Sequence, residues 1–136
     1  MERKTIITAR IFTGISAIIL LSVSIQALIS PQLVMDLVHV HLNNNDAKSS
    51  IRGVYGGVGL TLVISLIYLI INNIRHALIM LMLLWGFYAL SRIITIQVEG
   101  PLSNFGYQWL GIELLLFILA SILFIKANHD IKKTLR

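Results

Sequence analysis

Three ionisable side chains lie inside long apolar stretches of the sequence: Arg52, Arg92 and Glu113. A charge in such a place is costly unless it meets a partner of opposite sign or a polar ligand. Arg92 and Glu113 have two interpretations of equal weight. The first is an ion pair that fixes the register of two helices. The second is a polar site for a ligand head group or a proton.

Arg52 opens a glycine-rich segment, Arg-Gly-Val-Tyr-Gly-Gly-Val-Gly, which ends at Gly59. Each glycine costs a helix about 1 kcal/mol relative to alanine, so four of them within seven residues indicate close approach of a second backbone or of a ligand. Helix packing or dimerisation is the favoured interpretation, because Gly53 and Gly57 have the GxxxG spacing. A dinucleotide loop is excluded, since no strand precedes the segment.

The composition predicts that the chain is a membrane protein, whose helices would position the charged residues and the glycine-rich segment. Of 136 residues, 57% are hydrophobic and 12% are charged, whereas soluble domains carry about 25% charged residues. The mean hydropathy is +0.85, and a small soluble domain cannot hide so much apolar surface. The net charge of +5 comes from basic residues gathered at the chain ends. This placement favours a membrane protein over a nucleic-acid-binding one.

Four apolar segments are long enough to cross a bilayer, which takes about 20 residues per helix. We therefore expect an all-α integral membrane four-helix bundle that forms a single transmembrane domain over residues 1–136. The first segment is interpreted as a retained signal-anchor helix. The predicted spans are residues 5–29, 49–71, 76–98 and 105–127.

The loop after the first span predicts a short helix in the interfacial plane. Ser30 and Pro31 form a typical helix start, followed by apolar residues at helical spacing. Three consecutive asparagines then break this helix, and Asp46 is expected to cap the second long helix.

The distribution of lysine and arginine predicts the orientation. Both chain ends and the link that contains Arg75 carry basic residues, whereas the loop that contains Glu99 has none. The positive-inside rule then places both termini in the cytoplasm.

Each helix has one stripe expected to face the bundle. In the first, this stripe is small and mildly polar, as is typical of packed membrane helices. It consists of Thr13, Ser16, Ala17, Leu20, Ser24 and Ala27. In the third and fourth helices, Arg92 and Glu113 lie at similar depth and are predicted to pair. Arg52 lies nearer the interface, with Tyr55, Gln26 or Glu99 as possible partners.

The candidate ligand-binding residues form a polar cluster in the outer half of the bundle. They are Arg52, Tyr55, Gly56, Tyr88, Arg92 and Glu113. Interfacial anchoring and packing are the default interpretation of the aromatic residues. No metal site or cofactor is predicted, because His39 and His41 lack accompanying ligands and the chain has no cysteine. Common catalytic signatures are missing, so catalytic residues are unknown.

The order and spacing of these features resemble a family of small bacterial four-helix membrane proteins, described as domain of unknown function 4345. The resemblance rests on three features. These are the Arg52–Gly57 start of the second helix, Arg92 followed by Glu99-Gly100-Pro101, and Glu113. DoxX-type membrane proteins are a more distant likeness. The resemblance implies the fold and a location in the bacterial inner membrane, but no activity.

Three functions are compatible with the sequence. The first is binding of a lipid-like amphipathic molecule in the outer half of the bundle, with membrane lipids as partners. The second is a structural or accessory subunit that packs a partner or a second copy through the glycine-rich face. The third is a membrane enzyme that uses Glu113 as acid or base, although the sequence favours a protein without catalytic activity. Nucleic acid is not an expected partner.

Overall fold

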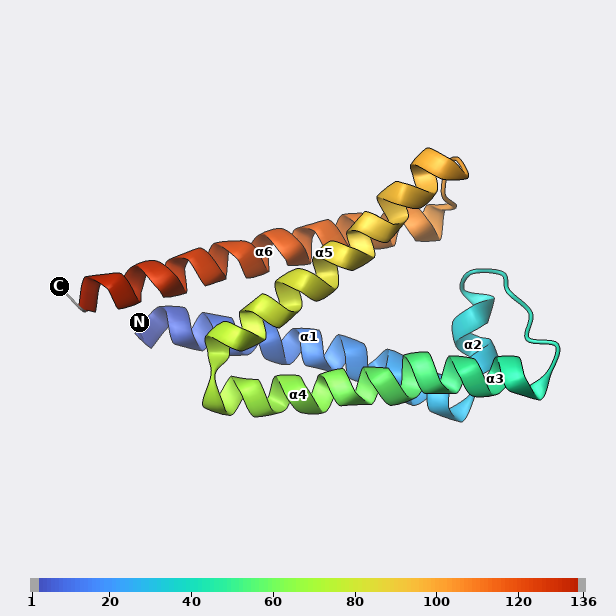
Figure 1. Cartoon of the computed structure of the whole chain (residues 1–136), viewed down its shortest axis with the longest axis horizontal. Helices are drawn as coiled ribbons and strands as arrows, with labels where there is room; N and C mark the ends of the chain where they lie inside the picture. The colour runs from blue at the N-terminus through green and yellow to red at the C-terminus, as the bar shows by residue number, and fades with distance from the viewer. Residues whose placement is uncertain (1–2, 135–136) are drawn as a thin grey trace. The chain divides into compact units, whose positions relative to one another are not determined.

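The computed structural model describes the backbone of residues 3–134 and the side chains of residues 3–128. Every regular element in this part of the chain is helical (Figure 1). The elements are α1 (Arg3–Ile29), α2 (Pro31–Asp36), α3 (Asn45–Ile51), the π-helix η1 (Arg52–Val58), α4 (Gly59–Asn72), α5 (Ile74–Val98) and α6 (Asn104–Thr134).

Four helical segments are long and apolar enough to cross a membrane. The second is continuous through α3, η1 and α4. The segments are Arg3–Ile29, Asn45–Asn72, Ile74–Val98 and Asn104–Asn128. The predicted class, an all-α membrane chain with four long helices, is confirmed.

The first turns of α2 and α3 show which residues of the local sequence begin a helix. Pro31 occupies the first turn of α2 as predicted, and Ser30 has the extended backbone of an N-cap, although its hydroxyl makes no capping hydrogen bond. The prediction that Asp46 caps the second long helix is wrong. Asn44 is the cap, because its side-chain oxygen accepts a hydrogen bond from the Ala47 backbone N–H at 2.7 Å. Asp46 instead lies in the first turn, where a negative charge complements the helix dipole.

Polar and apolar side chains are distributed as expected in lipid rather than in water. The predicted small-residue stripe of α1 is largely buried, including Thr13, Ser16 and Ser24. Large aliphatic side chains point outward instead, for example Ile18 and Ile71, with about two thirds of their surface exposed. Small polar residues inside and aliphatic residues outside are typical of helices packed in a bilayer.

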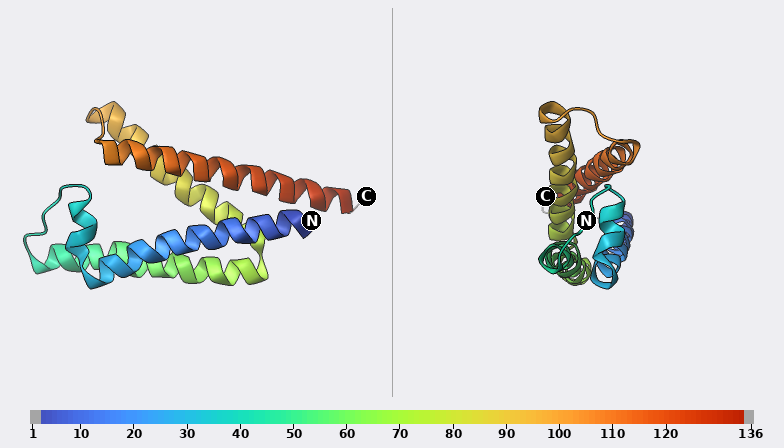
Figure 2. Two further views of the ribbon diagram at one scale, coloured as in Figure 1. Left: turned by 180° about the vertical axis from the view of Figure 1, so that it is seen from behind. Right: turned by 90° about the vertical axis from the view of Figure 1, so that its right-hand side faces the viewer.

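The contacts divide the chain into two compact units, each described here by itself. Unit 1 comprises Met1–Thr13 and Leu69–Arg136, and unit 2 comprises Gly14–Tyr68. The prediction of a single domain stays a prediction. In unit 1, α5 and α6 run antiparallel and pack together (Figure 2). Gly86 of α5 lies against α6, because an added Cβ there would lie 3.1 Å from the Phe117 ring.

Unit 2 has a small core beneath the loop that connects α1 to α3. Its buried members are Ala27, Val34, Met35 and Leu42. Gln32 holds the loop in place with both ends of its amide. The nitrogen donates to the Asp36 carboxylate and the Val40 carbonyl, and the oxygen accepts from the Leu42 backbone N–H at 2.9 Å.

Candidate functional site

Arg92 of α5 and Glu113 of α6 form the ion pair predicted from the sequence. Arg92 Nε lies 2.7 Å from Glu113 Oε2, and Arg92 Nη2 lies 2.9 Å from Glu113 Oε1. This is the two-pronged geometry in which a guanidinium and a carboxylate match best. The Glu113 side chain is only 3% exposed, whereas that of Arg92 is 24% exposed. The buried carboxylate is therefore hydrogen-bonded, and the Arg92 side chain remains partly exposed.

The pair solves the problem of placing two charges in an apolar span. Each charge alone costs roughly 2.5–3.5 kcal/mol on insertion scales, and together they carry no net charge. Both carboxylate oxygens of Glu113 accept hydrogen bonds from Arg92. The geometry thus gives Glu113 the role of holding the guanidinium and leaves neither oxygen free of Arg92.

Trp85 and Tyr88 are two of the aromatic residues that precede Arg92 on α5. Trp85 is 3% exposed, and its ring centroid lies 6.2 Å from that of Tyr88 in a tilted arrangement. The Trp85 indole nitrogen is buried and has no hydrogen-bond partner among the described residues. Tyr88 is 40% exposed. In unit 1, the partly exposed Arg92 side chain therefore lies one helical turn from the exposed Tyr88 phenol.

Arg52 lies in unit 2, where its partner is a backbone group. Its Nε donates a hydrogen bond to the Leu28 carbonyl at 3.1 Å. Leu28 is in the last turn of α1, where carbonyls lack partners within the helix. Within unit 2, the described side chains of Tyr55 and Gln26 form no hydrogen bond with Arg52; pairing with Glu99 stays a prediction. The Leu28 carbonyl lacks a partner within the helix, and this explains why it accepts the hydrogen bond from Arg52. The pattern of side chains in the sequence does not reveal this partner.

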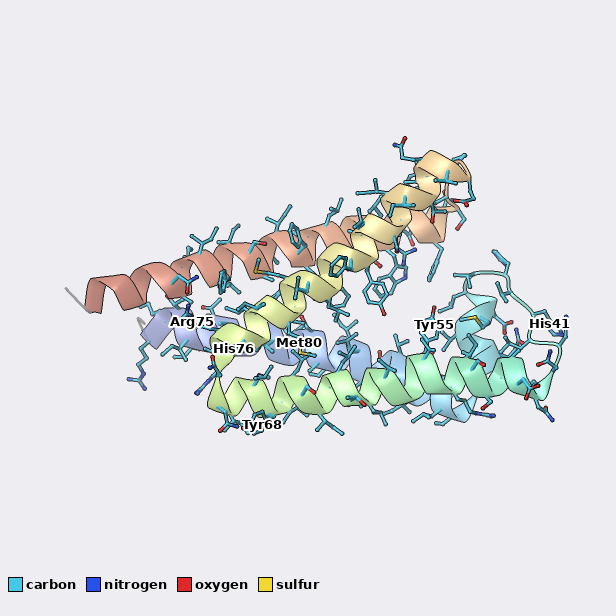
Figure 3. The ribbon with its side chains drawn as sticks, in the orientation of Figure 1. His41, Tyr55, Tyr68, Arg75, His76 and Met80 are labelled. Atoms are coloured by element: carbon cyan, nitrogen blue, oxygen red, sulfur yellow. The ribbon has the colours of Figure 1, made fainter. Side chains whose placement is uncertain are left out.

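The glycine-rich segment forms a π-helix over Arg52–Val58. Long π-helices are rare, and single-turn ones are frequent at functional sites. Tyr55, labelled in Figure 3, extends from this segment and is 36% exposed. The sequence predicts an ordinary helix here, because runs of glycine do not distinguish a π-helix from an α-helix.

The four glycines of this segment serve two different purposes. A Cβ on Gly56 would lie 2.6 Å from the Leu28 side chain, and one on Gly59 would collide with the Ser24 hydroxyl. These two glycines let the helix approach α1 closely. A Cβ on Gly53 or Gly57 would meet nothing within 4 Å. Close packing therefore accounts for half of the run, and the other half faces open space.

The candidate site residues divide between the two units. Tyr88, Arg92 and Glu113 belong to unit 1, and Arg52, Tyr55 and Gly56 belong to unit 2. The structure directly joins Arg92 to Glu113, and it brings Gly56 and Arg52 against Leu28. A cluster that contains all six residues stays a prediction.

Taken together, four long apolar helices and an internal ion pair define a multi-pass membrane protein. Residues 8–124 match the model of a family described as "Domain of unknown function (DUF4345)", and the chain belongs to this family. No curated protein and no solved structure matches the chain.

Proposed function

We propose that the protein binds a lipid-like amphipathic molecule with an anionic head group in the outer half of the membrane. Arg92 in unit 1 and Arg52 in unit 2 each offer a cationic group to such a molecule. The proposal rests on the guanidinium nitrogen of Arg92 that Glu113 does not contact. Glu113 occupies Nε and Nη2, so Nη1 remains to donate hydrogen bonds, and the side chain is 24% exposed. Glu113 acts by orienting the guanidinium.

Arg52 supports the proposal from unit 2. Only its Nε is engaged, by the Leu28 carbonyl, and the residue is exposed. The two terminal nitrogens are thus available to a phosphate or carboxylate, and arginine is well suited to both. The glycine-rich π-helix beside it has open space above Gly53 and Gly57, which would admit an acyl chain or another apolar group.

Native mass spectrometry of the purified protein tests the proposal. We expect the unchanged protein to retain an anionic amphipathic molecule. The variant Arg52→Gln and the double variant Arg92→Gln/Glu113→Gln should lose it, and the double variant leaves no stranded charge. Lys48→Gln is the matched control, because Lys48 is a cation one turn from Arg52 on the same helix. Equal retention by all four proteins would refute the proposal.

A second candidate function is favoured by the open glycines. Gly53 and Gly57 have the spacing at which membrane helices approach one another, and the structure leaves the space above both unfilled. In this proposal they pack against a second copy or a partner subunit. Crosslinking in membranes tests it: Gly57→Leu should abolish a crosslinked dimer. A strictly monomeric protein that co-purifies with no other protein would refute this alternative.

For the cellular location, we propose a bacterial inner membrane with both termini in the cytoplasm. The support is the excess of lysine and arginine at the chain ends and at the link between α4 and α5.

A further inference from the structure

The segment between α1 and α3 has an apolar surface that the described part of the protein leaves uncovered. α2 and the turn after it expose four large apolar side chains, each with about half of its surface accessible. They are Leu33, Leu37, Val38 and Val40. Other apolar residues of the same segment, among them Val34 and Met35, are buried in the core of unit 2. The segment is therefore apolar on two sides, and packing within unit 2 accounts for only one of them.

Hydrogen bonds give this segment a defined backbone shape. Gln32 forms three of them with residues further along the segment. At the end of α2, the Val40 N–H donates to the Met35 carbonyl at 3.0 Å, and His39 between them has a φ of 57°. This is the Schellman arrangement of a helix end, and histidine adopts the left-handed conformation more often than most residues. The exposed apolar side chains are thus carried on a fixed turn.

The short helix α2 lies across the long helices of unit 2 rather than along them. In Figures 1 and 2 it crosses the direction of α1, which ends at Ile29, and of the long helix that begins with α3. Helices that span a bilayer run close to its normal, with an average tilt of about 20°. α2 therefore lies near the plane of the membrane surface, at the depth where α1 ends.

The polarity of the chain changes abruptly after Val40. The exposed residues that follow, up to the first turn of α3, are all polar. They are His41, Asn43, Asn44, Asn45 and Asp46. His41 lies towards the tip of the loop (Figure 3), and α3 has no buried residue. Apolar residues thus occupy the part of the segment that follows α1, and polar residues occupy the part that leads into α3.

The lipid of the bilayer is the partner that fits the apolar part. This part directly follows Leu28 and Ile29, which are exposed at the end of a spanning helix, so it continues a lipid-facing surface. Asp36 and His39 are exposed on the same stretch, and such polar groups are costly at the centre of a membrane. The segment therefore belongs at the boundary between lipid and water, where amphipathic segments lie with their apolar side inserted.

We propose that the exposed side of α2 and its turn is inserted among the lipids, with acyl chains covering Leu33, Leu37, Val38 and Val40. The boundary between membrane and water then falls between Val40 and His41. The inserted surface anchors the loop between the first two spanning helices and fixes the depth at which α1 ends. It shares no residue with the sites proposed at Arg52 and Arg92, so either proposal can fail without the other.

Spin labelling of the purified full-length protein in phosphatidylcholine bilayers tests the insertion. The chain has no cysteine, so Leu33→Cys and Leu37→Cys each place one label on the proposed surface. Asn43→Cys and Ser49→Cys are matched controls at exposed polar positions of the same unit. Oxygen concentrates in lipid, whereas a charged or polar nickel chelate stays in water. The two leucine positions should be relaxed mainly by oxygen, at a depth of about 5–10 Å, and the two controls mainly by nickel.

The two reagents together separate the possible coverings of this surface. Relaxation of the leucine positions by nickel as strong as at Asn43 would overturn the proposal, because the surface would lie in water. Relaxation by neither reagent would also overturn it, because protein would then cover the surface. Leu33 and Leu37 are independent positions, so one variant that does not fold leaves the other to decide.

The role of Gln32 is tested in the Leu37→Cys protein. Gln32→Ala removes the three hydrogen bonds of its side chain and should increase the mobility of the label, seen as narrower spectral lines. An unchanged line shape would show that Gln32 does not hold the inserted turn in place.

Discussion

At the scale of single residues, the two arginines inside apolar spans are satisfied in different ways. Arg92 meets a carboxylate through two hydrogen bonds, and Arg52 meets the Leu28 carbonyl at the end of α1. The first partner could be predicted, because a buried cation at the depth of a buried anion leaves few alternatives. The second could not, since any of several backbone carbonyls at a helix end has the same need for a donor.

Breaking the Arg92–Glu113 pair on one side should be more harmful than removing it altogether. Arg92→Met strands the buried Glu113 carboxylate and is expected to cost about 3–5 kcal/mol of unfolding free energy. The double variant Arg92→Met/Glu113→Leu should recover most of that loss, because no charge remains buried. Unfolding by denaturant in detergent micelles measures both values. A double variant as unstable as the single one would show that the pair does not act as a unit.

At the scale of elements, the π-helix η1 and its neighbour α1 depend on the identity of particular glycines. The sequence predicted close packing from the number of glycines and from the GxxxG spacing of Gly53 and Gly57. In the structure the glycines that pack against α1 are Gly56 and Gly59, because the crossing point places Leu28 and Ser24 opposite them. Similarly, the sequence marked the start of α3 but led to the wrong cap. Asp46 was predicted and Asn44 is observed, and both side chains can accept the same hydrogen bond.

Alanine substitutions should distinguish the packed glycines from the open ones. Gly59→Ala brings a methyl group into the Ser24 side chain and should lower the unfolding free energy by roughly 1–3 kcal/mol, the cost of overpacking. Gly57→Ala meets no atom and should be neutral or stabilising by up to about 1 kcal/mol. Thermal unfolding of the two variants in the same detergent gives the comparison. Equal effects would contradict the packing role assigned to Gly59.

At the scale of the whole molecule, hydropathy and the lengths of the apolar runs were sufficient to predict the class of protein. The predicted spans fall within the four long helical segments of the structure, since a bilayer imposes a minimum length that few other environments require. A polar site that contains all six candidate residues stays a prediction, because a helical stripe in the sequence identifies a buried face but not the helix that buries it.

The topology can be measured cleanly because the chain has no cysteine of its own. Single cysteines placed at Lys4, Arg75 and Lys126 should react with a membrane-impermeant maleimide only after the membrane is opened. Cysteines at Asn45 and Ser103 should react in intact cells. This pattern follows from four spans with both termini in the cytoplasm. Labelling of Lys4→Cys and Asn45→Cys from the same side would contradict it.

The central claim, that an amphipathic molecule meets Arg52 and Arg92, is tested most directly by photo-crosslinking in the membrane. The probe is an anionic lipid with a diazirine near its head group, and peptide mass spectrometry locates the crosslinks. The account predicts that crosslinks concentrate on Arg52–Val58 and on the part of α5 around Tyr88 and Arg92, and that Arg52→Gln reduces those on the π-helix. Crosslinks spread evenly over the four long helices, with no enrichment at either segment, would contradict the account.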